Sequence, residues 1–188
     1  VSVTQNEDTS VTVTGVFARA SGDFVNLNTL TLDTVDYSGL LANASVSINN
    51  VDAGVTVTSI AGTTLTLSGP VTAVDNSVIS FGFGDTTSVS TKRLVVSSAD
   101  SVNAGILVNG ISGVAGPNAI AAVDSTTNTI ELEEVATVAS DAEITLTAFL
   151  LQRDGQVLNA GNDYFFQYNT NTNQVVFAAA STFTLGDY

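Results

Sequence analysis

The stretch Val57–Ser68 reads VTSIAGTTLTLS, and Ile120–Leu132 repeats its pattern as IAAVDSTTNTIEL. Each stretch opens with an apolar run, passes through a cluster of small polar residues and ends in an alternation of apolar and polar residues. An alternation with a period of two is typical of a half-buried strand, and clusters of Gly, Ser, Thr and Asn are typical of turns. The sequence therefore predicts the same small β-unit twice.

The repeat extends in both directions from these stretches, over Val46–Phe81 and Ile106–Leu146. Each copy closes with one more short strand, Val78–Phe81 in the first and Glu143–Leu146 in the second. The distance between equivalent positions grows from 60 residues at the first strand to 65 at the alternating strand, and the extra residues fall in predicted turns. Because an insertion of one residue inside a strand would exchange its buried and exposed faces, this placement indicates a repeat of folded modules.

The segments outside the repeat also favour strands. Two alternating stretches, Val1–Thr4 and Val11–Phe17, flank the polar run Gln5–Asp8, which is the pattern of a β-hairpin. Large rings supply much buried area, and aromatic residues are concentrated between Tyr164 and Phe183. We therefore expect four regions: an N-terminal hairpin region at 1–33, a first β-module at 34–88, a second β-module at 89–149, and an aromatic-rich, incomplete β-module at 150–188.

Helix is expected to be scarce. Val135–Ala142 has the composition for one or two helical turns, but it contains β-branched residues and has no amphipathic period. The rest of the chain consists of short predicted strands with frequent turn signals, the pattern of β-sandwiches and barrels. We expect an all-β protein built from tandem, small sandwich-like or barrel-like modules.

The charge balance restricts the partners. The chain has 4 basic and 18 acidic residues, a net charge of −14. Binding to phosphates relies on clustered Lys and Arg, so the sequence argues against nucleic acid as a partner. An anionic membrane surface would repel the chain, and Thr, Ser and Gly interrupt every apolar stretch, so membrane insertion is not expected.

The residue types that are missing restrict the chemistry. The chain has no Cys and no His, which removes disulfides, thiolate metal sites, the commonest general base and the commonest transition-metal ligand. It also has no Met and begins at Val1. We expect it to be processed or to belong to a longer polypeptide.

Two parts of the chain resemble a known family. The motif of Val57–Ser68 is similar to a module of virion structural proteins from tailed bacteriophages, especially marine cyanophages. The C-terminal segments Asp154–Leu158, Gly161–Tyr164 and Asn173–Phe177, with Gly186-Asp187, resemble modules of phage fibres and virions. The resemblance implies a structural virion component at the virion surface: a fibre, a head or tail decoration, or a neck or baseplate accessory. It implies partners among copies of itself, other virion proteins and host-surface glycans, and it brings no active site.

Two other functions stay open. The composition also fits a subunit of an extracellular filament or surface layer assembled by strand exchange, in which Val1–Thr4 or Val11–Phe17 inserts into the next subunit. A carbohydrate-binding module is the other alternative, because Tyr164, Phe166 and Tyr168 alternate along one predicted strand and would form a platform for a sugar.

Paired carboxylates are the first candidates for chemistry. Glycoside hydrolysis needs two carboxyl groups at a fixed separation, and five acidic residues lie close together in the second repeat. In Glu131-Leu132-Glu133, however, the period of two places both carboxylates opposite Leu132, which is the pattern of a solvated strand face. The five acidic residues are Glu131, Glu133, Glu134, Asp141 and Glu143.

Calcium is a second candidate. Asn6–Asp8, Asp75-Asn76 and Asn159–Asp163 cluster oxygen ligands in predicted turns. None of them matches the spaced calcium-binding loop of twelve residues, and the alternative is that Asn and Asp bond to their own backbone.

Lys92-Arg93 and Asn43-Ala44-Ser45 complete the candidates. Lys92-Arg93 is interpreted as a source of structural salt bridges, with an isopeptide bond from Lys92 as an alternative. Asn43-Ala44-Ser45 is a lone glycosylation sequon. The sequence thus predicts a protein that is not an enzyme, with no catalytic, cofactor or metal-ligating residue assigned and calcium as the one conceivable ion.

Overall fold

The computed structural model describes residues 2–5, 9–34, 42–100, 102–109, 118–147, 149–153, 156–158, 164–169 and 174–179. The all-β prediction is confirmed: this part of the chain consists of antiparallel strands and contains no helix. Residues 135–139, where one or two helical turns were conceivable, continue a strand. Within the described part, no helix is long and apolar enough to cross a membrane.

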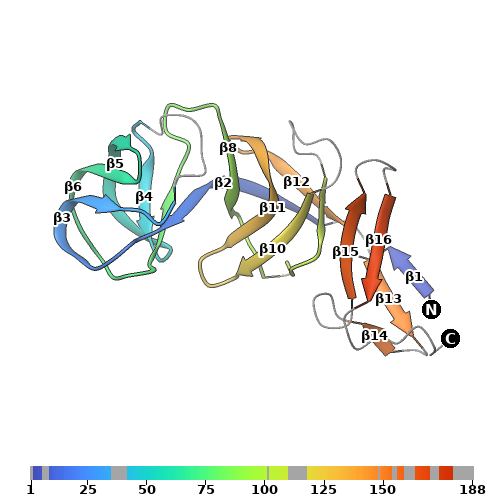
Figure 1. The fold of residues 1–188 in the computed structure, drawn as a ribbon. Coiled ribbons are helices and arrows are strands. Elements are labelled where there is room, and N and C mark those ends of the chain that lie inside the picture. Colours follow the sequence, from blue (N-terminus) through green and yellow to red (C-terminus); the bar gives the residue numbers. More distant parts are fainter. Residues whose placement is uncertain are drawn as a thin grey trace.

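Figure 1 shows the strands, and long and short ones occur along the whole chain. In chain order they are β1 (Ser2–Gln5), β2 (Thr9–Arg19), β3 (Phe24–Thr31), β4 (Ser45–Ile48), β5 (Val51–Ala61), β6 (Thr64–Ala73), β7 (Val78–Phe81), β8 (Ser88–Val96), β9 (Leu107–Asn109), β10 (Asn118–Asp124), β11 (Thr129–Ala139), β12 (Glu143–Thr147), β13 (Phe149–Arg153), β14 (Gln156–Leu158), β15 (Tyr164–Asn169) and β16 (Gln174–Ala179).

One antiparallel sheet of eleven strands forms the centre of the described structure. Its order is β12-β9-β10-β11-β8-β2-β7-β4-β5-β6-β3. β12 also pairs with β2, from Glu143 opposite Thr12 to Leu146 opposite Thr9. This extra pairing closes β2, β8, β11, β10, β9 and β12 into a ring, which we call the second ring.

The other half of the sheet closes on the same strand. Ala20, directly after β2, forms an antiparallel bridge with Leu32, directly after β3. The Ser21 N–H donates to the Thr31 carbonyl at 2.8 Å, and the Asp33 N–H donates to the Arg19 carbonyl at 2.8 Å. These contacts close β2, β7, β4, β5, β6 and β3 into the first ring.

The same connectivity occurs in both rings, with β3 to β7 in the first corresponding to β8 to β12 in the second. The repeats therefore lie in one sheet and share β2. The strand that corresponds to β8 is β3, which lies before the boundary expected at residue 34. Independent folding of the two modules stays a prediction.

The apolar core follows the repeat. Leu30 and Leu94, Leu65 and Ile130, and Ile79 and Ile144 occupy corresponding positions on corresponding strands, and all six side chains are fully buried. Complete burial of an aliphatic side chain contributes about 1.5–3 kcal/mol. The alternating apolar residues of the repeat are thus what stabilises both rings.

The predicted N-terminal hairpin is wrong. The two stretches do form strands, but β1 pairs with β13, from Ser2 opposite Gln152 to Gln5 opposite Phe149, and not with β2. The reason is that β2 already has strands on its edges: β12 and β7 follow one another on one side, and β8 lies on the other. The turn propensity of Gln5–Asp8 is a local property and carries no information about which strands compete for the edges of β2.

Candidate functional site

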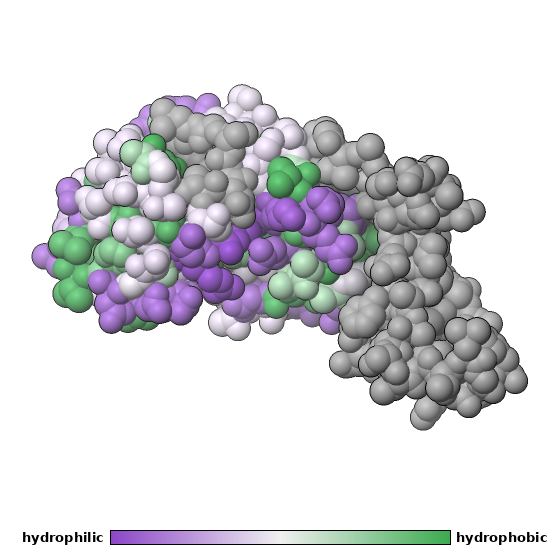
Figure 2. All heavy atoms as spheres, in the orientation of Figure 1, coloured by the Kyte–Doolittle hydropathy of each residue, from purple (hydrophilic) through white to green (hydrophobic). Residues whose placement is uncertain are grey.

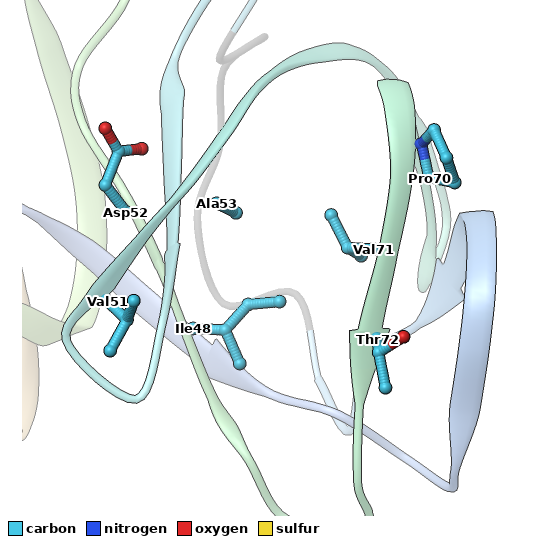
Figure 3. A pocket seen from close by; sticks show the side chains of 7 residues that line it. All are labelled: Ile48, Val51, Asp52, Ala53, Pro70, Val71 and Thr72. Atoms are coloured by element: carbon cyan, nitrogen blue, oxygen red, sulfur yellow. The ribbon is translucent and has the colours of Figure 1, made fainter.

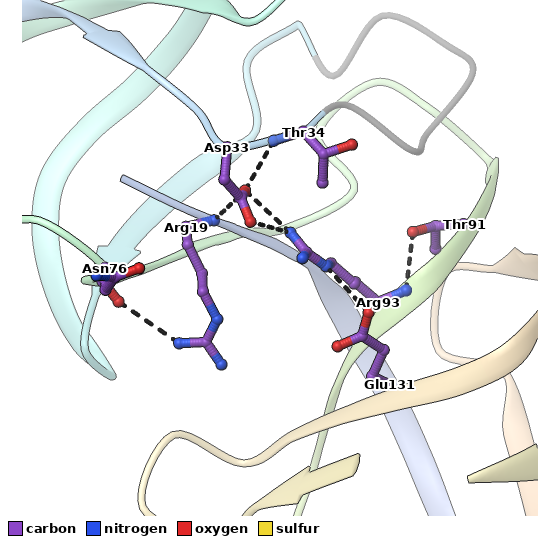
Figure 4. A network of polar contacts seen from close by, with 7 residues as sticks. All are labelled: Arg19, Asp33, Thr34, Asn76, Thr91, Arg93 and Glu131. Carbon is purple, nitrogen blue, oxygen red and sulfur yellow. Dashed lines mark hydrogen bonds and ion pairs between the residues drawn. The ribbon is translucent and has the colours of Figure 1, made fainter. Parts of the chain in front are cut away.

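A network of polar contacts lies between the rings (Figure 4), and we call it the brace. It consists of Arg93, Asp33, Glu131, Arg19 and Thr34. Arg93 on β8, in the second ring, donates through Nη1 to both carboxylate oxygens of Asp33, which follows β3 in the first ring, at 3.0 and 2.8 Å. Its Nε lies 3.5 Å from Oε1 of Glu131 on β11. The ion pair of Arg93 with Asp33 thus joins the two rings, and the contact with Glu131 lies within the second ring. The predicted structural salt bridge at Lys92-Arg93 is confirmed for Arg93.

Backbone groups fix the carboxylate of the brace. Asp33 Oδ1 also accepts the N–H groups of Arg19, at 2.9 Å, and Thr34, at 2.8 Å. Phe17 lies beneath both arginines, with its ring centroid 5.8 Å from Cζ of Arg19 and 5.5 Å from Cζ of Arg93. Figure 2 shows hydrophilic surface in purple across the middle of the molecule, where the rings meet.

The electrostatics of the brace favour a permanent positive charge. Burial lowers the pKa of Arg93, but the hydrogen bond and the charge of Asp33, together with Glu131, outweigh burial and raise this pKa above its ordinary value. The side chain of Arg93 is 13% exposed. An arginine that is always protonated and half enclosed by carboxylates cannot act as a base, so the chemistry of this cluster is structural.

Removal of Arg93 should destabilise the fold. Arg93→Met leaves Asp33 and Glu131 without their cation, and we expect a loss of about 2 kcal/mol, between the values for exposed and buried ion pairs. Urea unfolding followed by circular dichroism measures it. The matched control is Asp33→Asn alone and combined with Arg93→Met. If the two losses are additive, the ion pair contributes nothing of its own.

A shallow hollow of about 310 Å³ lies in the first ring, between the β4–β5 hairpin and β6 (Figure 3). It lies beyond Val57 and Leu67, the last paired residues of β5 and β6 on this side. Its lining is mostly aliphatic, and Ile48 and Val71 point into it from opposite sides. The lining residues are Ile48, Val51, Asp52, Ala53, Pro70, Val71 and Thr72.

The hollow has little chemistry. Asp52 Oδ1 accepts the N–H of Gly54 at 2.9 Å, so this carboxylate holds its own turn. Pockets for drug-sized ligands have volumes of about 300–1,000 Å³ and contain a few polar groups that orient the ligand. The hollow is at the lower limit of that range and can receive at most a small apolar group.

The acidic residues of the second repeat serve different purposes. Glu131 is half-buried in the brace, whereas Glu133 and Glu134 are exposed, and Leu132, between Glu131 and Glu133, is buried. The interpretation of a solvated strand face agrees with the exposure of Glu133, but not with Glu131, which is half-buried beside Arg93. The Nζ of Lys92 donates to the backbone carbonyl of Glu133.

The bulge in β11 is held by a residue that sequence inspection did not single out. Asn118, which is buried, donates through Nδ2 to the Glu134 carbonyl at 2.7 Å and accepts the Glu134 N–H through Oδ1 at 3.1 Å. Its side chain thus takes the place of a neighbouring strand where the register of β11 with β8 shifts between Glu131 and Ala136.

Loss of this amide should weaken the second ring. Asn118→Ala leaves the N–H and carbonyl of Glu134 without these partners, and we expect a loss of about 2 kcal/mol. Thermal or chemical unfolding measures it, and Asn103→Ala, at an exposed position, is the control. Equal stability of the two variants would contradict the role given to Asn118.

Of the turns that were candidates for calcium binding, Asp75-Asn76 lies in the described part, and Asp75 forms hydrogen bonds within the protein. Asp75 Oδ1 accepts the N–H of Gly22 at 2.8 Å, the Asp75 N–H donates to Asp23 at 2.8 Å, and Asn76 has a φ of 62°. Among the described residues, no group of three or more His, Cys, Asp or Glu is placed to hold a metal ion. Asn6–Asp8 and Asn159–Asp163 lie outside the described residues.

Another acidic turn shows the same use. Asp124, the last residue of β10, accepts the N–H of Thr126 at 2.9 Å. Burial raises the pKa of Asp124, but hydrogen bonds from Thr127 and Thr126 outweigh it and lower this pKa below its ordinary value. The carboxylate is therefore held in its charged form to stabilise the turn.

The asparagine of the glycosylation sequon forms a hydrogen bond within the protein. Asn43 has a φ of 58°, and its Nδ2 donates to Asp85 Oδ2 at 2.6 Å. The same nitrogen would have to carry a glycan, so glycosylation would break this bond. The side chains of the predicted sugar platform, Tyr164, Phe166 and Tyr168, lie outside the described part, although the backbone of β15 pairs with β16.

The arrangement of these polar groups is mainly architectural. Sequence inspection found Arg93 and Glu131, but it missed Asp33, Phe17 and Asn118, because their partners lie on distant strands. Glu131 lies opposite Arg93 on the neighbouring strand. The sequence alone does not reveal this pair, because it depends on the register between β11 and β8. Searches with this chain against protein-family models, curated proteins and solved structures found no match.

Proposed function

We propose that this protein is a structural building block of an assembled particle, and that it acts through contacts of its surface with copies of itself and with neighbouring proteins. The particle that the sequence motifs favour is the virion of a tailed bacteriophage. There the chain would serve as a fibre, decoration, neck or baseplate component.

The observation that carries the proposal is the use of the polar side chains. Arg93 and Asp33 join the rings, Asn118 holds a bulge, and Asp75 and Asp124 hold turns. These groups stiffen the backbone, and stiffness is what a lattice or fibre needs from its parts. The resemblance of Val57–Ser68 to virion modules supplies the choice of particle.

The proposal is tested by locating the protein. An antibody raised against the folded protein is applied to purified virions and to cells from the source culture and is detected by immunogold electron microscopy. Labelling at a defined position on virions, with the protein found by mass spectrometry in gradient-purified particles, is the expected result. Labelling of cell-surface filaments or a surface layer instead supports the filament alternative and overturns the virion proposal.

A third outcome separates assembly from ligand binding. Binding to host glycans on an array, lost on Tyr168→Ala with the fold intact, would favour the carbohydrate-binding alternative. Labelling of neither virions nor surface structures, together with glycan binding, would sink the building-block proposal.

A further inference from the structure

The first residues of the chain pair with its second half, although the first ring follows them directly (Figure 1). β1 pairs with β13, residues 9–12 of β2 pair with β12, and residues 13–16 of β2 pair with β8. From Val16 onward, β2 pairs with β7 of the first ring. We call β1 together with residues 9–16 the arm, and we call the strands β8 to β13, which hold it, the acceptor.

The arm is bound in the acceptor as a regular strand with a buried apolar face. Val11 is 7% exposed and Val13 is fully buried. The Thr12 carbonyl accepts the Ser97 N–H at 2.8 Å, and the Val13 N–H donates to the Ala142 carbonyl at 2.8 Å. Residues 9–16 carry no charge. The structure thus identifies what the acceptor binds: a neutral strand with valines at alternate positions.

One short connection links the arm and the first ring to the acceptor. It consists of residues 82–87, between β7 and β8, and the chain has no Cys that could add a disulfide. The Thr86 N–H donates to the Phe83 carbonyl at 3.0 Å, and the Ser140 N–H donates to the Thr87 carbonyl at 3.2 Å. Among the described residues, the other contacts between the two parts are hydrogen bonds, ion pairs and apolar packing, which a second copy can supply equally.

An exchange of arms between two copies would keep nearly all of these contacts. The pairings of the arm with β8, β12 and β13, and the ion pair of Arg93 with Asp33, would form again between copies. Only the turn in residues 82–87 would open, and exchange of identical elements is for this reason a low-cost route to dimers. A short linker holds the parts that it joins at an effective concentration on the order of millimolar. Exchange therefore competes where copies are packed that closely, as they are in an assembled particle.

We propose that copies associate by reciprocal exchange, in which the arm of each copy pairs with the acceptor of the other and residues 82–87 connect the two. The proposal rests on the proposed function and names the surface through which copies associate, namely the edges of β8, β12 and β13. The partner is a second copy because the arm of this chain is the strand that these edges bind in the structure. In dilute solution each acceptor binds the arm of its own copy.

Cysteine cross-linking between two full-length variants tests the exchange, because the natural chain has no Cys. Ser10 on β2 lies directly opposite Thr145 on β12, and opposed residues have Cα atoms about 4.5–5.5 Å apart, within reach of a disulfide. Ser10→Cys and Thr145→Cys, tagged to differ in mass, are unfolded together in urea, refolded at about 1 mM and oxidised. Non-reducing gels measure the heterodimer. We expect about ten times the yield obtained from Thr145→Cys mixed with Ser125→Cys, an exposed control in the β10–β11 turn.

Dilution and a double variant complete this experiment. Refolding at about 10 µM should lower the heterodimer yield to that of the control, because the linker then outcompetes the second copy. The double variant Ser10→Cys/Thr145→Cys should form its disulfide within one chain at this concentration, which verifies the pairing of β2 with β12.

Strain in the linker gives the second readout. Gly84 has a φ of +56°, and an added Cβ would meet backbone atoms of Ala42 and Ala44. Strained hinge loops favour exchange, because an opened linker can move away from such a contact. Gly84→Ala, added to both cysteine variants, should therefore raise the heterodimer yield severalfold at a given concentration. Gly62→Ala, at a φ of +59° in the β5–β6 turn, should leave the yield unchanged.

Three results would overturn the inference: a heterodimer yield at about 1 mM equal to that of the Ser125→Cys control, a double variant that does not close within one chain, or equal yields with Gly84→Ala and Gly62→Ala. Such a failure leaves the proposed function intact if virions are labelled, because copies can associate through other surfaces. Failed labelling, in turn, leaves a measured exchange of arms intact.

Discussion

Replacing Gly15 by Ala should cost the protein about 3 kcal/mol or more of its free energy of unfolding, near the upper end for overpacking of a core position. A Cβ at Gly15 would lie 2.1 Å from the carbonyl oxygen of Phe81 and 3.0 Å from its carbonyl carbon. Both are backbone atoms of β7, so no side chain can turn aside to make room. The strands themselves would have to separate.

The position of Gly15 makes this separation costly. It lies on β2 between the residues that pair with β12, which end at Thr12, and those that pair with β7, which begin at Val16. Displacement there disturbs both rings at once. Guanidinium unfolding followed by circular dichroism should therefore show one transition at a much lower denaturant concentration.

Gly69→Ala is the matched control for Gly15→Ala. Gly69 also lies in a strand, but its added Cβ would meet only Cγ1 of Val55, at 3.1 Å, and that side chain can move. We expect a change within about 1 kcal/mol, because Ala in a strand also regains some of the conformational entropy that Gly loses on folding. Equal effects at the two glycines would show that β2 and β7 do not approach closely at Gly15.

Gly84→Ala should lower the free energy of unfolding by about 3 kcal/mol. The loss has two sources, the left-handed backbone and a clash with neighbouring backbone atoms, and a variant at Gly62 measures the first source alone. Gly84 has a φ of +56°, and its added Cβ would lie 2.3 Å from the Ala42 carbonyl oxygen and 2.5 Å from the Ala44 nitrogen. Gly62 has nearly the same φ, +59°, with nothing within 4 Å of an added Cβ. Gly62→Ala should therefore cost only about 1 kcal/mol, the price of the left-handed backbone in an L-residue.

The difference between these two variants measures the backbone contact alone. It is obtained from denaturant midpoints under identical conditions, with equal slopes as the check that the unfolded states are comparable. A difference near zero would mean that the segment after β7 does not press against Ala42–Ala44.

Much of the architecture was accessible from the sequence because it depends on local alternation. The strands around Leu65–Leu67, Val78–Phe81, Ile130–Leu132 and Glu143–Leu146 lie where the repeat predicted them. The pairing of these strands was not accessible in the same way. β1 and β2 illustrate this, since their partners are chosen by competition among strands far apart in the chain.

The polar cluster was only partly predictable for the same reason. Arg93 stood out because the chain has so few cations. Asp33, 60 residues away in the sequence, had no local feature to distinguish it from the other acidic residues in turns. Asn118 resembled an ordinary turn residue, and its role depends on a bulge in β11 that no alternation pattern reveals.

Because both rings use β2, the two halves of the molecule differ in whether they contain all the strands of their own ring. Two separate six-stranded rings would need twelve strands, and this sheet has eleven. A gene fragment that ends after Gly84 would keep β2 and encode every strand of the first ring. A fragment that begins at Ser88 would lack Thr9–Val16, the segment that seals the second ring against β12 and β8. The C-terminal repeat is therefore a dependent copy, which can complete its sheet only with a strand donated by the N-terminal part of the chain.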